Sequence, residues 1–309
     1  MKDAPKTNLA TEIGSVSLPN PVMTASGTSG QGAELANYFD LSLLGAIVVK
    51  SLHIEPWPGN PPPRLHPTPA GMINSVGLEG PGVREWLNND LPLLEEAGAR
   101  IVVSIWGRTV EEFAQAAKEL AQASKSVIAV EVNASCPNLE DRKNLFAHSL
   151  EATKEVVEVS LAAERPCWAK LSPNTPDLPQ IAVVAKKAGA EAVTVANTLL
   201  GMTIDLETRK PLLGAGRGGV SGPAVKPIAV RSVFDTYAEN PDLPIIGVGG
   251  ITKGRDVSEF MMAGAAAIQV GTATFANPRA SKKILKEFSK WCKDQSLEEM
   301  NQLIGAAHE

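Results

Sequence analysis

The chain has 309 residues, of which 44% are hydrophobic and 20% charged, a balance typical of a soluble globular protein with a large core. The net charge of −5 argues against a general affinity for nucleic acid or anionic membranes. The three cysteines, Cys136, Cys167 and Cys292, have no zinc-site spacing and no disulfide pattern, so we expect a reducing, cytoplasmic location. We also expect neither a signal peptide nor a membrane span, because no apolar run is long enough.

Short apolar segments rich in β-branched residues alternate with helical patterns along most of the chain. A weakly alternating hairpin is predicted over 9–19, before the first of them. Eight parallel strands are predicted over 20–27, 46–51, 100–105, 127–132, 167–171, 192–196, 244–248 and 267–270. Helices are predicted over 109–124, 149–163, 177–188, 223–237, 255–263 and 281–295.

Eight strand candidates, most of them followed by a helix, fit a (β/α)8 TIM barrel that forms one domain over residues 1–309. A doubly wound open sheet is the alternative, but it usually has fewer units and a glycine-rich turn after its first strand. Two irregular segments interrupt the alternation. Residues 55–69 contain seven prolines, which predict a stiff, ordered loop, and residues 199–222 contain six glycines and are predicted to be a second long loop.

Polar residues follow the predicted strands, and in a barrel the carboxyl ends of the strands build the active site. The segment Asn133-Ala134-Ser135-Cys136-Pro137-Asn138 follows the fourth strand, where the cysteine is either a reactive group in a polar pocket or a buried structural thiol. The residues at the other strand ends form a chemically coherent set: Ser26, Lys50, Lys170, Asn197, Thr198, Gly249, Gly250, Gly271 and Thr272.

The glycines after the seventh and eighth strands suggest a phosphate site, because these loops often bind phosphate through backbone amides. The alternative is that they only permit tight turns. Lys50 and Lys170 end apolar strands and are either rim lysines or cations facing a phosphorylated flavin. Asparagines at 74, 138 and 197 offer a donor and an acceptor each, which suits a small flat molecule with amide groups.

With these motifs assembled, the chain resembles the soluble, cysteine-dependent class of dihydroorotate dehydrogenases. The resemblance runs from Asn20 to Thr272, and its segments are Ala25-Ser26-Gly27-Thr28, Asn60-Pro61-Pro62-Pro63-Arg64, Asn74-Ser75-Val76-Gly77-Leu78, residues 133–138, Lys170-Leu171-Ser172-Pro173, Asn197-Thr198, Ser221-Gly222-Pro223-Ala224 and Gly247-Val248-Gly249-Gly250-Ile251. The segments at 60–64 and 221–224 look most like the NAD-linked subgroup, whose catalytic chain works with a separate iron–sulfur flavoprotein.

The resemblance implies oxidation of (S)-dihydroorotate to orotate in pyrimidine (UMP) biosynthesis, with FMN as hydride acceptor and Cys136 as catalytic base. Ser135 is the rival base. Substrate contacts are implied for Lys50, Asn74, Ser75, Val76, Gly77, Leu78, Asn133, Asn138, Asn197 and Thr198. Cofactor contacts are implied for Ala25, Ser26, Gly27, Lys50, Ser51, Ser104, Asn133, Lys170, Ala196, Gly222, Gly249, Gly250, Gly271 and Thr272.

The resemblance also implies a homodimer and, because this chain has no cysteine cluster, a separate subunit that carries FAD and an iron–sulfur centre and uses NAD. Two departures from the family pattern stand out: residues 139–148, where the subgroup often has a glycine pair, and Ser104, where an asparagine is common. The alternatives are a related flavin barrel acting on another dihydropyrimidine or cyclic amide, and a catalytically inactive binding subunit.

Overall fold

The computed structural model describes residues 7–135 and 145–308, so Cys136 and Asn138 lie outside the described residues. Eight parallel strands form one sheet in the order β3-β16-β15-β10-β9-β8-β7-β4, and a bridge between Met23 and Ala46 joins its two edges into a barrel. The strands are β3 (Val22–Thr24), β4 (Ile47–Val48), β7 (Ile101–Ile105), β8 (Val127–Asn133), β9 (Cys167–Lys170), β10 (Ala192–Val195), β15 (Ile245–Val248) and β16 (Ala265–Val270).

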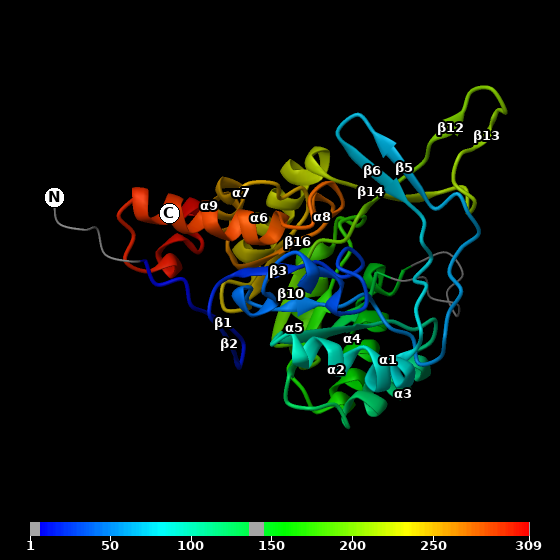
Figure 1. Ribbon diagram of the computed structural model, residues 1–309, viewed down its shortest axis with the longest axis horizontal. Helices are drawn as coiled ribbons and strands as arrows, with labels where there is room; N and C mark the ends of the chain where they lie inside the picture. Colours follow the sequence, from blue (N-terminus) through cyan, green and yellow to red (C-terminus); the bar gives the residue numbers. More distant parts are fainter. Residues whose placement is uncertain (1–6, 136–144, 309) are drawn as a thin grey trace.

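Helices surround this barrel, as a strand–helix alternation predicts (Figure 1). The predicted helices are present as α3 (Val110–Leu120), α4 (Leu150–Ser160), α5 (Leu178–Lys187), α6 (Lys226–Glu239), α7 (Gly254–Met262) and α9 (Ala280–Asp294). Three further helices were not predicted: α1 (Val83–Asn89), α2 (Leu91–Glu96) and the one-turn α8 (Ala273–Ala276). The (β/α)8 prediction is therefore confirmed, with α1 and α2 filling the gap between β4 and β7.

Helix α3 illustrates how the local sequence sets these elements. The Thr109 side chain accepts a hydrogen bond from the backbone N of Glu112, as its position before the helix predicts. The Glu112 carboxylate in turn accepts from the backbone N of Arg108, one residue outside the usual capping box. Phe113 and Leu120 lie on the buried face of α3 and contribute to the core between the barrel and its helices.

The N-terminal hairpin is present as β1 (Thr11–Ile13) and β2 (Val16–Leu18). Its apolar residues Ile13, Val16 and Leu18 belong to the same buried cluster as Trp168 and other interior barrel residues. The hydroxyl of Thr11 donates to the carbonyl of Ala266, near the start of β16. The hairpin thus closes the amino end of the barrel and leaves the carboxyl end for a site.

A second sheet stands at the carboxyl end, and three of its four strands fall in segments that were predicted to be loop. Its order is β11-β14-β6-β5, all antiparallel, with β5 (Leu65–Thr68), β6 (Gly71–Asn74), β14 (Gly218–Ser221) and β11 (Leu199–Gly201). Strands β12 (Ile204–Asp205) and β13 (Lys210–Pro211) form a hairpin that projects beyond it (Figure 1). The loop prediction for 199–222 and for the end of 55–69 was wrong. Pro67 and the glycines of β14 hide the strand pattern, and Pro67 is tolerated because β5 is an edge strand.

Within the described residues, none of the helices combines the length and the apolar character needed to cross a membrane.

Candidate active site

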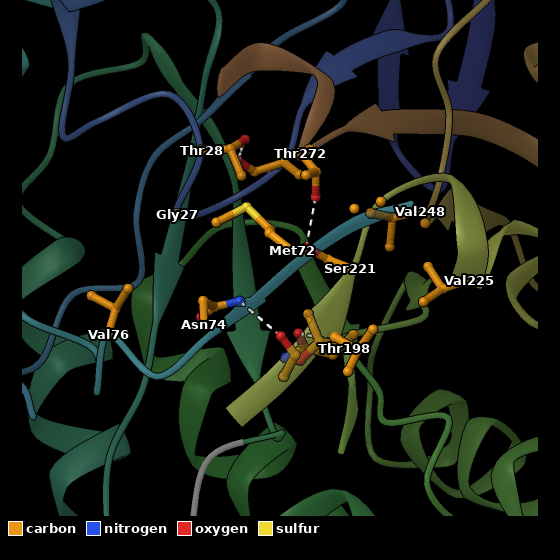
Figure 2. Close-up of a pocket in the computed structure, with 18 of the residues that line it drawn as sticks. Gly27, Thr28, Met72, Asn74, Val76, Thr198, Ser221, Val225, Val248 and Thr272 are labelled. Carbon is orange, nitrogen blue, oxygen red and sulfur yellow. Dashed lines mark hydrogen bonds between the residues drawn. The ribbon is translucent and has the colours of Figure 1, made fainter. Parts of the chain in front are cut away.

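A cavity of about 1000 Å³ lies at the carboxyl end of the barrel, where the barrel strands meet the second sheet. Barrel residues just after β3, β4, β10, β15 and β16 line it from below, and residues of β6 and β14 line it from the other side. Figure 2 shows Met72 and Asn74 of β6 beside Ser221 of β14, with Thr272 reaching across to Ser221 from the end of β16. The cavity therefore occupies the place where barrel enzymes carry their active sites.

Most residues singled out in the sequence line this one cavity. They are Ala25, Ser26, Gly27, Lys50, Ser51, Asn74, Ser75, Val76, Gly77, Leu78, Asn133, Lys170, Ala196, Asn197, Thr198, Gly222, Gly249, Gly250, Gly271 and Thr272. Ser104 is fully buried behind the cavity wall, where its hydroxyl pairs with that of Ser51 at 2.9 Å. It supports a lining residue and does not line the cavity itself. The predictions for Cys136 and Asn138 fall outside the described residues.

Side chains build one end of the cavity, which we call the amide end: Lys50, Asn74, Asn133, Asn197 and Thr198. The Asn133 side chain donates to Ser51 Oγ at 3.1 Å and accepts from Asn197 Nδ2 at 3.5 Å. Asn197 Oδ1 accepts from the backbone N of Thr198 at 2.8 Å, and Asn74 Nδ2 donates to the carbonyl of Gly219 (Figure 2). These contacts fix the orientation of each amide.

Two lysines reach the cavity. Burial lowers the pKa of Lys50; the positive charge of Arg64 adds to this effect, and Glu79 opposes it. Lys170 is 4% exposed, and its ammonium lies 3.1 Å from Ser26 Oγ and 3.5 Å from a carboxylate oxygen of Glu131. Both ammonium groups sit in surroundings with little water, where a charge acts strongly on an anionic ligand.

Hydrogen bonds and an ion pair join the proline-rich segment to the amide end. Asn60 Nδ2 donates to Ser75 Oγ at 2.9 Å, and the backbone N of Asn60 donates to the Val76 carbonyl. Arg64 donates from Nε to the Asn60 carbonyl and forms an ion pair with Glu79. These bonds tie the loop to residues 75–79, of which 75–78 line the cavity next to Asn74.

Backbone builds the opposite end, which we call the glycine end: Gly222, Gly249, Gly250, Gly271 and Thr272. Gly249 and Gly250 follow β15 with φ of +133° and +74°, and an added Cβ would lie 2.8 Å from Ala229 Cβ and 2.7 Å from Lys226 Cβ respectively. A side chain at either position is therefore excluded by both backbone conformation and space. The small residues leave backbone exposed to the cavity, as a phosphate group requires.

Several cavity residues were not found by sequence reasoning. Ser172 and Asn174 follow β9, and Asn174 Nδ2 donates to Ser172 Oγ and to the carbonyl of Thr198. Met72, Ser221, Arg217 and Lys283 also line the cavity. The signal for Met72 was a weak alternation in 65–74 with a turn at Ala70-Gly71, and nothing local in the sequence marks Lys283.

The two cysteines that the structure describes, Cys167 and Cys292, are structural. Burial raises the pKa of Cys167 in β9 to about 12, with a contribution from Glu191, and burial raises the pKa of Cys292 in α9 to about 11. Both thiols stay protonated at neutral pH and do not line the cavity.

The cavity suits a flavin in the chemistry of its lining. Cations and amides occupy one end and an open backbone the other. Ala25, Met72, Val225 and Val248 add apolar lining, which we call the apolar wall; Figure 2 shows the last three. Gly27 has φ +84° and no atom within 4 Å of an added Cβ, so its backbone faces open space. A ring with a lactam edge and a phosphate tail matches this order.

Comparison with known proteins identifies the family. The family model described as dihydroorotate dehydrogenase matches residues 8–291. A protein of Desulforamulus reducens named dihydroorotate dehydrogenase B (NAD(+)), catalytic subunit, is 45% identical over 304 residues, which is 98% of this chain and 99% of that relative. Proteins with the same name from Desulforudis audaxviator and Alkaliphilus metalliredigens are 46% and 43% identical, covering 98% and 97% of this chain and 98% and 99% of the relatives.

Proposed function

The chain belongs to the dihydroorotate dehydrogenase family, which oxidises dihydroorotate in pyrimidine biosynthesis, and we propose that it does so as the FMN-binding catalytic subunit of an NAD-linked enzyme. The match covers nearly the whole chain, and the relatives carry the name of a catalytic subunit. The observation that carries the proposal is the convergence of Lys50, Lys170 and three asparagines from separate strands on one cavity.

FMN would lie with its phosphate at the glycine end and the polar edge of its ring toward Lys170. When bound, the flavin supplies a two-electron acceptor that takes a hydride from the substrate. Ser26 and Lys170 would hold the ring edge, and backbone groups of Gly249, Gly250 and Gly271 would hold the phosphate. The apolar wall would keep water from the face of the ring.

The substrate would bind at the amide end. The ammonium of Lys50 would pair with the carboxylate of dihydroorotate, and Asn74, Asn133 and Asn197 would hydrogen-bond the carbonyl and N–H groups of its ring. Because hydrogen bonds already hold the three amides, Asn133 to Asn197, Asn197 to the backbone N of Thr198 and Asn74 to the Gly219 carbonyl, they offer their remaining donors and acceptors in set directions. This fixed pattern would select one flat cyclic imide over isomers of similar size.

Cys136 would act as the base. As a thiolate it would take a proton from the ring carbon next to the carbonyl, while the neighbouring carbon loses its hydride, so that a carbon–carbon double bond forms. The residue lies outside the described residues, and its assignment rests on the motif at 133–138. Asn133, at the end of β8, begins that segment within the cavity wall.

The first experiment tests the substrate. The purified chain is loaded with FMN, and flavin absorbance is followed without oxygen after addition of dihydroorotate or of dihydrouracil, which lacks the carboxylate. We expect rapid bleaching with dihydroorotate only. Equal bleaching by both compounds would favour a related dihydropyrimidine oxidoreductase, and failure to retain flavin would contradict the proposal.

The second experiment tests the partner. This chain carries no cysteine cluster in its sequence, so two electrons must leave the flavin for an external acceptor. We propose an iron–sulfur flavoprotein subunit with FAD that passes them to NAD. The isolated chain should then reduce NAD slowly despite fast flavin reduction, and addition of that subunit should restore the rate. NAD reduction by the chain alone at the rate of flavin reduction would show that no partner is needed.

The family resemblance also leads us to propose a homodimer. Sedimentation equilibrium of the FMN-loaded chain measures this directly, and a mass of one chain at all concentrations would contradict it.

A further inference from the structure

A buried carboxylate lies directly beneath the candidate active site. Glu131 is fully buried in β8 and does not line the cavity. It lies two residues before Asn133 on the same strand, so both side chains point into the barrel, Glu131 one layer deeper. Three donors from three other strands surround its carboxylate: Lys170 Nζ at 3.5 Å, Thr194 Oγ1 at 3.0 Å and Gln269 Nε2 at 2.6 Å.

This polar layer is unusual for its place in the fold. Barrel interiors are normally filled by layers of branched apolar side chains. A buried ion pair contributes little net stability, because the cost of removing both charges from water offsets their attraction, and apolar replacements are often as stable. Thr194, Gln269 and Glu131 are all fully buried. Because such a layer adds little stability, we look for its role in the position that it gives to the Lys170 side chain.

Of the four side chains in this polar layer, Glu131, Lys170, Thr194 and Gln269, only Lys170 lines the cavity. Its ammonium lies between the Glu131 carboxylate below and Ser26 Oγ above, and of these groups Lys170 and Ser26 line the cavity. Register explains the placement: Asn133 pairs with Lys170 between β8 and β9, and Lys170 pairs with Thr194 between β9 and β10. Glu131 itself pairs with Trp168, two residues before Lys170, so the carboxylate lies one layer below the Lys170 position and within 3.5 Å of its ammonium.

We propose that Glu131 is a positioning residue that holds the Lys170 ammonium facing Ser26 at the floor of the cavity. Thr194 and Gln269 fix the carboxylate, and the carboxylate fixes the ammonium. The proposal rests on the proposed function, since it assigns Lys170 the role of stabilising negative charge on the reduced flavin. Glu131 does not itself touch flavin or substrate.

A double-mutant cycle tests this directly. Glu131→Gln, Lys170→Met and the double variant are loaded with FMN, and the flavin midpoint potential and the FMN dissociation constant are measured in each. We expect Glu131→Gln to weaken the preference for reduced over oxidised flavin about tenfold, which for a two-electron couple lowers the potential by about 30 mV. In the Lys170→Met background the same substitution should change the potential little, because the group it acts through is gone.

The results of this cycle distinguish a failure of the positioning role of Glu131 from a failure of the proposed function. A shift of equal size in both backgrounds, or no shift in either, overturns the positioning role while leaving the enzyme assignment intact. Wild-type chain that binds no FMN contradicts the proposed function itself. Glu131→Asp keeps the charge and should fall between wild type and Glu131→Gln, and it supplies the comparison if Glu131→Gln does not fold. Thr194→Val leaves both charges and removes one of the three donors to the carboxylate, so it should shift the potential in the same direction but less than Glu131→Gln does.

Discussion

The two ends of the cavity are built from different parts of the chain. At the amide end, side chains of Lys50, Asn133 and Asn197 line the cavity, and the Asn133 amide is held by bonds to Asn197 and Ser51. At the glycine end, the absence of side chains at Gly249 and Gly250 brings the backbone close to α6. The amide end therefore supplies specific side-chain groups, an ammonium and several amides, and its function is lost when one of them is removed. The glycine end supplies space and backbone groups, which any added atom would disturb.

This difference predicts how substitutions act. At the amide end, removal of a group should change catalysis or substrate affinity and leave the flavin bound. At the glycine end, addition of a methyl group should weaken flavin binding and folding together. The predictions below run from the largest expected effect to the smallest.

Substituting Cys136→Ala should give the largest change. General-base catalysis contributes about 10²–10⁴-fold, so flavin reduction by dihydroorotate should slow by this order while FMN remains bound. Stopped-flow absorbance of the flavin measures the rate. Ser135→Ala is the matched control, because it removes the rival base next to Cys136. If Cys136→Ala reduces flavin at the wild-type rate, the cysteine is not the base, and if Ser135→Ala carries the loss instead, the hydroxyl is.

At the glycine end, Gly250→Ala should weaken FMN binding by tenfold or more. The alanine would adopt a left-handed conformation at a cost of about 1–2 kcal/mol, and its Cβ would also collide with the Cβ and backbone N of Lys226. Fluorescence titration with FMN measures the affinity.

The matched control is Gly98→Ala, which has φ +66° but only Ser42 Cβ near the new atom, at 3.7 Å. Gly98→Ala has the same unfavourable backbone conformation but lies outside the cavity lining. The thermal stability of this variant should therefore fall without a change in its FMN affinity. Equal FMN affinity in Gly250→Ala and wild type would show that this end of the cavity does not hold the cofactor.

The contrast between the two ends also explains what the sequence could predict. The barrel strands were predictable because buried parallel strands are runs of β-branched residues, as in 127–132, and the strand-end residues followed from the barrel rule. The second sheet was not predictable, because Pro67 and the glycines of β14 have low strand propensity. In addition, β14 pairs with β6 across a long sequence separation, which no local pattern reveals. The pairing of Glu131 with Lys170 depends on strand register, which no local pattern reveals.

The charge of Lys50 makes the amide end sensitive to pH. Burial lowers the pKa of Lys50, so its ammonium loses its proton at a lower pH than an exposed lysine does. Below that pKa the ammonium pairs with a substrate carboxylate, and above it the pairing is lost. Orotate binding to the FMN-loaded chain should therefore weaken toward alkaline pH, by up to about tenfold per pH unit above the pKa.

Isothermal titration of orotate between pH 7 and pH 10 checks this prediction, with Lys50→Met as the comparison. The variant should bind orotate weakly and without this pH dependence. A wild-type affinity that stays constant to pH 10, or the same alkaline decline in Lys50→Met, would remove Lys50 from the role of carboxylate partner.

The smallest expected effect concerns the support of the amide end. Arg64 connects the proline-rich loop to Glu79 and, through Asn60, to Ser75. Because Arg64 and Glu79 are partly exposed, their ion pair contributes no more than about 1 kcal/mol to stability. Arg64→Ala should leave thermal unfolding nearly unchanged but loosen residues 55–69, since the bonds to the carbonyls of Asn60 and Pro58 are lost as well.

Hydrogen exchange of the FMN-loaded chain tests this, because the backbone N of Asn60 bonds to the Val76 carbonyl and the backbone N of Ser75 to the Arg64 carbonyl. Exchange at these two amides should speed up in Arg64→Ala, together with a several-fold rise in KM and little change in kcat. Arg84→Ala, which breaks a surface ion pair with Glu119 away from the cavity, is the control. Unchanged exchange at both amides with an unchanged KM would mean that the prolines alone hold the loop, and that the amide end needs no support from Arg64.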